Sequence, residues 1–434
     1  MPNPPSGKTA HRFYKWELLV LLFAAYFFHQ ADRAIFGVVT TDIQNDLNLS
    51  STQIGAAQTA MFLTLAIMVP IAGFVGDRFN KKWIITGSIL FWSLATMLTG
   101  WVGGLLGIIV IRSIATAGSE SFYAPPAVSL IAAWHKNTRS LALSVHQAAL
   151  YIGMITSGAV AGWIAMNYGW RVTFYTFGGI GFLVGLLFIF RLKGAPGETA
   201  APAPEKNAVA AGAAAPNEKP LSVWQTIRTL VSKPSVLLLT TGFVAIVFVN
   251  NAYLSWAPKF LQEKFSLSPA AAGTNAMFWH HIAALVFIMI GGSLSDLMVR
   301  RAPRFRVGLQ CAAMLLGAPL IFLMGKSGSL PVVCAAMFMF GAMRGLYEAN
   351  TQASIFDVVE PRMRSSLVGL MIMTAFLVGS LSPLLLGKLQ DVYGAAEGLS
   401  RGFVILSASW VLGGIAVLSC ALFTFKRDRI VENS

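Results

Sequence analysis

The sequence predicts an all-α membrane protein with twelve transmembrane helices arranged as two six-helix repeats. Of its 434 residues, 56% are hydrophobic and only 12% are charged, whereas a soluble domain carries about 25% charged residues. Apolar runs of about twenty residues recur along the chain, and this is the length that crosses a hydrocarbon layer of about 30 Å. A charged motif also occurs once in each half. Together these observations predict a duplicated membrane bundle.

The repeated motif lies between apolar runs. Its first copy reads GFVGDRFNKK from Gly73 to Lys82, and its second reads GSLSDLMVRR from Gly292 to Arg301. Each copy has a glycine, an aspartate four positions later and a basic pair four positions after that. Glycine allows a neighbouring helix to approach closely, helix N-termini favour aspartate, and basic residues mark the cytoplasmic side. Matched turns in two apolar halves are typical of secondary transporters.

The motif resembles the G-x-x-x-D-R-x-x-[RK]-[RK] signature of the major facilitator superfamily. The first copy matches it fully through Gly73, Asp77, Arg78, Lys81 and Lys82. The second copy has Leu297 at the arginine position, and it retains Gly292, Asp296, Arg300 and Arg301. The resemblance implies the major facilitator fold. We interpret these matching residues as a gating motif, and we expect the second copy to hold its helices together less strongly than the first.

The first half contains six predicted spans and the second half repeats this plan. The first six runs are about 14–40, 52–75, 83–101, 105–134, 140–166 and 170–190. A polar cluster at 29–33 interrupts the first run, and a polar outer loop at 42–50 follows it. Gly158 and Gly162 in the fifth run form a close-packing face, which suits either rocking helices or static packing. The last six runs are about 236–260, 270–298, 307–324, 331–358, 364–392 and 403–425.

Between the halves, an alanine- and proline-rich stretch from Gly194 to Pro220 predicts a flexible linker. A short amphipathic helix at 221–232 is expected to lie on the inner membrane surface. These features predict an N-terminal six-helix bundle at 1–192, a cytoplasmic linker at 193–234 and a C-terminal bundle at 235–434.

The net charge of +14 reflects membrane topology rather than a nucleic-acid partner. If the N-terminus is cytoplasmic, six of the 32 lysines and arginines lie on the outer side, three lie within spans and 23 lie on the cytoplasmic side. This asymmetry predicts that both termini are cytoplasmic. No cleavable signal peptide is recognised at the start of the chain. The expected location is a bacterial inner membrane, with the lipid bilayer as the main partner and a monomeric state.

Several other function classes lack their sequence signals. The chain has no cluster at metal-ligand spacing, no nucleophile motif and no phosphate-binding glycine-rich loop. Its three cysteines all fall inside predicted spans, as expected of core thiols. We therefore expect a protein that is not an enzyme and that uses no cofactor and no metal. A receptor without transport activity stays open as an alternative.

Ionisable residues inside the predicted spans are the candidate site. They are Asp32, Arg33, Arg112, Glu120, Arg344 and Glu348. A charge at this depth costs at least about 2.5–3.5 kcal/mol on insertion scales, so these three cations and three anions are expected to face one another or a watered cavity. Arg112 and Glu120 share a broad face of one helix, and Arg344 and Glu348 lie one turn apart.

The chemistry of these groups predicts proton-coupled transport of an anion. Arginine is permanently charged and binds carboxylates bidentately, whereas carboxyl groups in a poorly solvated cavity can titrate. We expect substrate contacts from Arg33, Arg112, Arg344, Tyr123, Asn250 and Trp256, and proton coupling by Asp32, Glu120 and Glu348. The histidines His29, His146, His280 and His281 are expected mainly to fill packing positions.

Two branches of the superfamily share these features. Asp32-Arg33, Arg112 with Gly118-x-Glu120, and Trp256-Ala257-Pro258 resemble the anion:cation symporter family. That resemblance implies import of sugar acids or other small organic anions with protons, sodium not being excluded. The segments Asp357–Pro361 and Ser382-Pro383 resemble the spinster-like lipid exporters. A small organic anion is the first expectation, and lysolipid export is the second.

Overall fold

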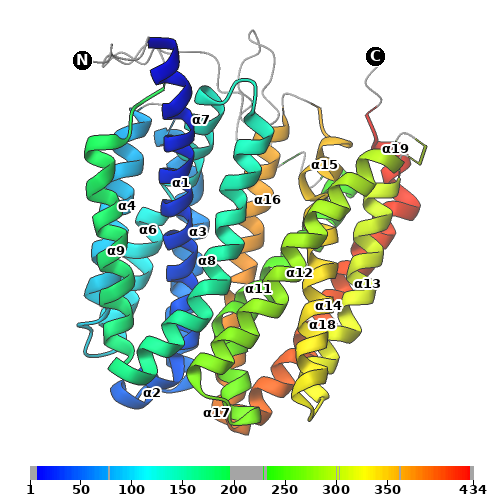
Figure 1. Cartoon of the computed structure of the whole chain (residues 1–434). Helices are drawn as coiled ribbons and strands as arrows, with labels where there is room; N and C mark the ends of the chain where they lie inside the picture. Colours follow the sequence, from blue (N-terminus) through cyan, green and yellow to red (C-terminus); the bar gives the residue numbers. More distant parts are fainter. Residues whose placement is uncertain are drawn as a thin grey trace.

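The computed structural model describes residues 7–76, 79–195, 228, 232–299, 301–302, 304–360 and 363–430. These residues form twelve helices that are long and apolar enough to cross a membrane, which confirms the predicted all-α membrane fold. Helix α1 begins and helix α19 ends on the same side of the bundle (Figure 1), which we call the termini side. The opposite side is called the far side.

The first six spans run up and down in sequence order. The helices of this part are α1 (Gly7–Val38), α2 (Thr40–Leu47), α3 (Ser51–Gly76), α4 (Lys81–Thr99), α5 (Leu105–Ile108), the π-helix η1 (Ile109–Ala117), α6 (Gly118–Glu120), α7 (Ala124–Trp134), α8 (Arg139–Tyr168) and α9 (Trp170–Arg191). Short turns join most of them, so neighbouring spans are antiparallel.

The last six spans form the other half of the bundle (Figure 1). They comprise α11 (Pro234–Phe265), α12 (Pro269–Met298), α13 (Phe305–Lys326), α14 (Leu330–Glu348), α15 (Thr351–Phe356), α16 (Arg364–Gly379), α17 (Leu381–Tyr393), α18 (Ala395–Ser419), the π-helix η3 (Cys420–Thr424) and α19 (Phe425–Asp428). The proposed bundle limits at 192 and 235 stay a prediction. The predicted linker and amphipathic helix lie almost entirely outside the described residues.

Two spans are less regular than the sequence predicts. The fourth span passes from α-helix to π-helix and back, then forms a turn at 121–123 before α7. Pro125 and Pro126 lack the N–H groups that would continue the ladder, and their rings crowd the carbonyls four residues earlier. In the eleventh span, Pro383 likewise has no N–H to donate to the Gly379 carbonyl. The Ser382 hydroxyl donates a hydrogen bond to that carbonyl instead, at 2.9 Å.

Other boundaries differ because polar residues extend or continue helices. The cluster at 29–33 does not interrupt α1. The predicted loop at 42–50 is mostly helix α2, which ends where Asn48 adopts the left-handed conformation with a φ of 51°. The twelfth span begins at Ala395 rather than near 403, and an ion pair between Glu397 and Arg401 joins its first turns at 2.7 Å.

The two halves pack closely on the far side. Helix α8 lies along α12, and α3 lies along α17. At Gly158 of α8, an added Cβ would lie 2.4 Å from the carbonyl oxygen of Gly273 on α12, and at Gly162 it would lie 2.5 Å from Ala270 Cα. The close-packing face expected in the fifth span is thus confirmed. Only glycine allows the backbones to approach this closely.

The far side also carries polar contacts between the halves. Asp391 of α17 accepts hydrogen bonds from the backbone N–H groups of Ser51 and Thr52, both at 2.9 Å. The carboxylate thereby caps the N-terminus of α3, where negative charge is favoured. Lys259 of α11 donates to the side chains of Gln44 and Ser51. The far side is therefore closed by charge and backbone contacts as well as by apolar packing.

We predict that Gly158→Val opens the far side, because its side chain cannot fit against Gly273. The assay uses a chain in which serines replace the native cysteines and a single cysteine replaces the buried Ile54. With Gly158→Val, this cysteine should react faster with a membrane-impermeant maleimide than it does without that substitution. Gly179→Val is the matched control, since nothing lies within 4 Å of a Cβ there. Equal labelling rates in the two glycine variants would contradict the prediction.

Candidate functional site

Asp32 and Arg112 form a buried ion pair between the first and fourth spans. The Arg112 guanidinium donates to both carboxylate oxygens of Asp32, at 2.9 and 3.0 Å, and to its backbone carbonyl at 3.2 Å. The rings of Phe36 and Phe174 flank this guanidinium. Arg112 is 2% exposed, so in this state its partner is internal rather than a ligand in a cavity.

A second pair lies beside the first. Arg33 Nε donates to Glu120 Oε2 at 3.0 Å. Glu120 is fully enclosed, and its other oxygen, Oε1, has no hydrogen-bond partner. His29 Nε2 lies 3.8 Å from Glu120 Oε2, and this nitrogen is also buried without a hydrogen bond. The structure thus adds His29, for which we expected a packing role, to the surroundings of Glu120.

The third pair is in the second half. Arg344 Nε donates to Glu348 Oε1 at 2.8 Å, one turn along α14, so the expected adjacency is confirmed. The same guanidinium donates to Asn250 Oδ1 at 2.6 Å and lies 3.0 Å from His280 Nε2. Tyr151 of α8 donates to Glu348 Oε2 at 3.5 Å and so links this group to the first half.

Two other candidate residues are buried in helix packing, although the ring of one of them, Tyr123, lies 5.7 Å from the His29 ring, centroid to centroid. Tyr123 is completely buried, and its hydroxyl donates to the Leu22 carbonyl at 2.6 Å and contacts His146. Trp256 is also completely buried, and its indole N–H donates to the Pro383 carbonyl at 3.0 Å. Both satisfy their polar atoms through the backbone of other helices.

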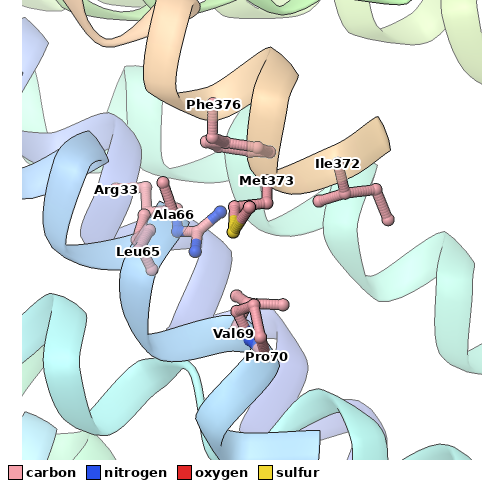
Figure 2. A pocket seen from close by; sticks show the side chains of 8 residues that line it. All are labelled: Arg33, Leu65, Ala66, Val69, Pro70, Ile372, Met373 and Phe376. Carbon is pink, nitrogen blue, oxygen red and sulfur yellow. The ribbon is translucent and has the colours of Figure 1, made fainter. Parts of the chain in front are cut away.

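Arg33 is the charged side chain that lines a pocket between the halves. Figure 2 shows its guanidinium between the Leu65–Pro70 face of α3 and the Ile372–Phe376 face of α16. The other lining side chains are all apolar. The pocket has a volume of about 40 Å³, which holds roughly three water molecules. A larger ligand therefore requires α3 and α16 to separate.

The gating motif is described in part. Asp77, Arg78 and Arg300 lie outside the described residues, and Gly73 lies in α3. Asn80 caps α4 by accepting from the backbone N–H of Lys82 at 3.0 Å. The Lys82 ammonium donates to the Ile189 carbonyl at 3.0 Å, while Lys81 precedes it in the first turn of α4.

The second copy of the motif forms an ion-pair network on the termini side. Arg306, in the first turn of α13, pairs with Asp296 at 3.3 Å and with Asp357 at 3.2 Å. Burial raises the pKa of Asp357, and the Arg306 guanidinium opposes this shift. The expected close helix approach at Gly292 is wrong for this state, because no atom lies within 4 Å of an added Cβ. Arg301, at the end of the motif, is exposed.

Comparison with known proteins identifies the family. The sequence profile of the Major Facilitator Superfamily matches residues 22–383. The chain belongs to the Major Facilitator Superfamily. It is therefore a multi-pass membrane protein of a secondary-transporter family, as the signature turn indicated.

Relatives of this superfamily member include spinster homologues and a hexuronate transporter. The chain is 26% identical to rat protein spinster homolog 1, over 99% of this chain and 87% of the relative. It is equally 26% identical to the Bacillus subtilis hexuronate transporter, over 96% of both chains. Its fold matches a crystal structure of a bacterial homologue of the human lysosomal transporter spinster, in an inward-facing, unoccupied conformation, with a TM-score of 0.82 at 20% identity, over 96% of this chain and 99% of the other.

We predict that Asp32→Ala destabilises the protein by about 3–5 kcal/mol, because it leaves the Arg112 charge buried without a partner. The double variant Asp32→Ala/Arg112→Met removes both charges and should recover most of that loss. Thermal unfolding in detergent measures both. Asp46→Ala is the control, since its ion pair with Arg171 is exposed and should contribute little. A melting temperature for Asp32→Ala equal to that of the control would refute this assignment.

Proposed function

We propose that this chain is a proton-coupled symporter of a small organic anion that works by alternating access. The observation that carries the proposal is the placement of Arg33. Its guanidinium lines the pocket between the halves, and its ion-pair partner, Glu120, is buried behind it. A permanent cation held by a titratable acid can exchange that internal partner for a substrate carboxylate.

The coupling step follows from competition for Arg33. When Glu120 is ionised, it holds the Arg33 guanidinium. When Glu120 takes up a proton, its charge disappears and the guanidinium can bind a substrate carboxylate instead. His29 Nε2 lies 3.8 Å from Glu120 Oε2, the oxygen that also accepts a hydrogen bond from Arg33, and we propose that His29 assists this proton exchange. Loss of the proton restores the internal pair and releases the anion.

The remaining candidates have supporting roles in this proposal. The Asp32–Arg112 pair holds the first and fourth spans together beside Glu120. Arg344 is a second cation that an anion can contact, with Asn250 and Glu348 as its present partners. The similarity to a hexuronate transporter over nearly the full length supports a sugar acid as the substrate. We propose that the termini side is cytoplasmic and that the membrane is a bacterial inner membrane.

A lipid-like substrate is the second candidate, and the pocket lining favours it. Except for Arg33, the lining side chains are apolar and come from α3 and α16 (Figure 2). Such a surface suits an anion with a hydrocarbon part better than a polyhydroxylated one. The similarity to spinster homologues is consistent with this second candidate, which would make the chain a lysolipid exporter of the spinster-like type.

We predict that Glu120→Gln abolishes uphill uptake but retains exchange, because glutamine mimics a carboxyl group that never releases its proton. Radiolabelled glucuronate in proteoliposomes measures both: accumulation driven by an imposed pH gradient, and exchange at equal pH. Glu397→Gln, at an exposed ion pair, is the control and should accumulate substrate like the wild type. Proton-driven accumulation by Glu120→Gln would overturn the coupling role.

We predict that Arg33→Ala weakens binding of the anionic substrate by at least about tenfold, since a charge-assisted hydrogen bond contributes roughly 1.5–3 kcal/mol. A thermal-shift series with glucuronate, other carboxylates and lysophospholipids on purified protein would identify the class. Arg401→Ala, at an exposed site, is the matched control. Stabilisation by lysophospholipids alone would favour the second candidate, and unchanged stabilisation of Arg33→Ala would refute both.

A further inference from the structure

A groove opens on the surface of the first half, and none of the residues of the three charged pairs lines it. It lies where α3, α4 and α6 meet, and it has a volume of about 510 Å³, within the roughly 300–1,000 Å³ typical of ligand sites. Trp83 and Phe91 of α4 line it and are each 56% exposed. Because α4 is long and apolar enough to cross a membrane and these aromatic side chains are exposed, we infer that this surface faces the hydrocarbon of the bilayer.

Missing side chains and a helix break create the groove. Gly87 of α4 and Gly118 of α6 both line it, and nothing lies within 4 Å of a Cβ at either position. Next to Gly118, the fourth span leaves the helical path at 121–123, so the wall of the bundle is not filled by a continuous helix. The groove therefore results from Gly87, Gly118 and the two prolines, Pro125 and Pro126, that follow the turn.

Apart from the indole N–H of Trp83, the polar side-chain groups that line the groove are already hydrogen-bonded within the protein. Its two polar lining residues are Ser88 and Ser119. The Ser88 hydroxyl donates to the Ser119 carbonyl, and the Ser119 hydroxyl is within hydrogen-bond distance of the carbonyls of Ala115 at 2.6 Å and Thr116 at 3.0 Å. With these donors used internally, the groove suits a hydrocarbon chain rather than a polar solute.

The length of the groove and the lysine at one end indicate which class of lipid it binds. From Trp83 to Phe91 the lining of α4 spans about 12 Å, close to one leaflet of a core about 30 Å thick. Lys82 precedes Trp83 at the termini-side end of α4, and its ammonium lies 4.9 Å from the centroid of the Trp83 ring. A lysine and a tryptophan at the membrane boundary favour an anionic headgroup above the chain.

We propose that this groove binds one anionic phospholipid of the termini-side leaflet, with an acyl chain between α3, α4 and α6 and its phosphate near Lys82. The site lies on the lipid-facing surface, outside the proposed transport pathway. It therefore does not depend on which substrate the protein carries.

Native mass spectrometry of protein purified from phosphatidylglycerol nanodiscs tests the proposal. The wild type should retain one phosphatidylglycerol molecule after mild delipidation. Gly87→Leu places a bulky side chain in the groove, where nothing lies within 4 Å of an added Cβ, and should reduce this retention at least about tenfold. Gly179→Leu, at another open glycine of a span, is the matched control and should retain the lipid. Equal retention by the two leucine variants would overturn the proposal.

The headgroup contact is tested separately. Lys82→Gln should lower retention of phosphatidylglycerol about fivefold, as expected for one basic residue at a membrane surface, and should leave retention of phosphatidylcholine unchanged. A matching thermal unfolding temperature confirms that each variant is folded. Equal loss of both lipids, or no loss of either, would exclude an anionic headgroup at Lys82.

Discussion

The free-energy cost of placing a charged side chain in the hydrocarbon of the bilayer determines how the charges of this structure are arranged. Each ionisable side chain that we identified at spanning depth is held by one of opposite sign. The pairs are Asp32 with Arg112, Arg33 with Glu120, and Arg344 with Glu348. Buried pairs add little net stability, but removing one partner is costly. The first and fourth spans are therefore linked by two ion pairs, and these pairs help to fix their relative position.

A second constraint acts where the halves meet on the far side. The contact is made largely by backbone: Gly158 lies against Gly273, and Asp391 binds the free N–H groups at the start of α3. The alternating access that we propose would require this contact to separate and close again. The small-residue face in the fifth span is therefore a close contact between the halves, and rocking of the helices at this face stays a prediction.

Sequence reasoning predicted regular features better than irregular ones. Span positions follow from hydropathy, because crossing the bilayer fixes a minimum apolar length. The prolines at 125, 126 and 383 are evident in the sequence. Where the helices break, at 121–123 and at Ser380, depends on which groups replace the backbone hydrogen bonds that proline cannot make. Tyr123 and Trp256, expected to contact substrate, lie in helix contacts in this structure. Aromatic residues with one polar atom fit either environment, so their type alone did not decide it.

By itself, the sequence determined the number of spans, the family signature and the presence of three positive and three negative charges within the membrane, because composition and spacing along the chain carry that information. It also placed Arg344 and Glu348 together, since they are one helical turn apart. Only the tertiary structure decided that Arg112 is enclosed by Asp32 whereas Arg33 lines a pocket. Neighbouring residues of a helix point in different directions, and the packing of other helices determines which of them a ligand can reach.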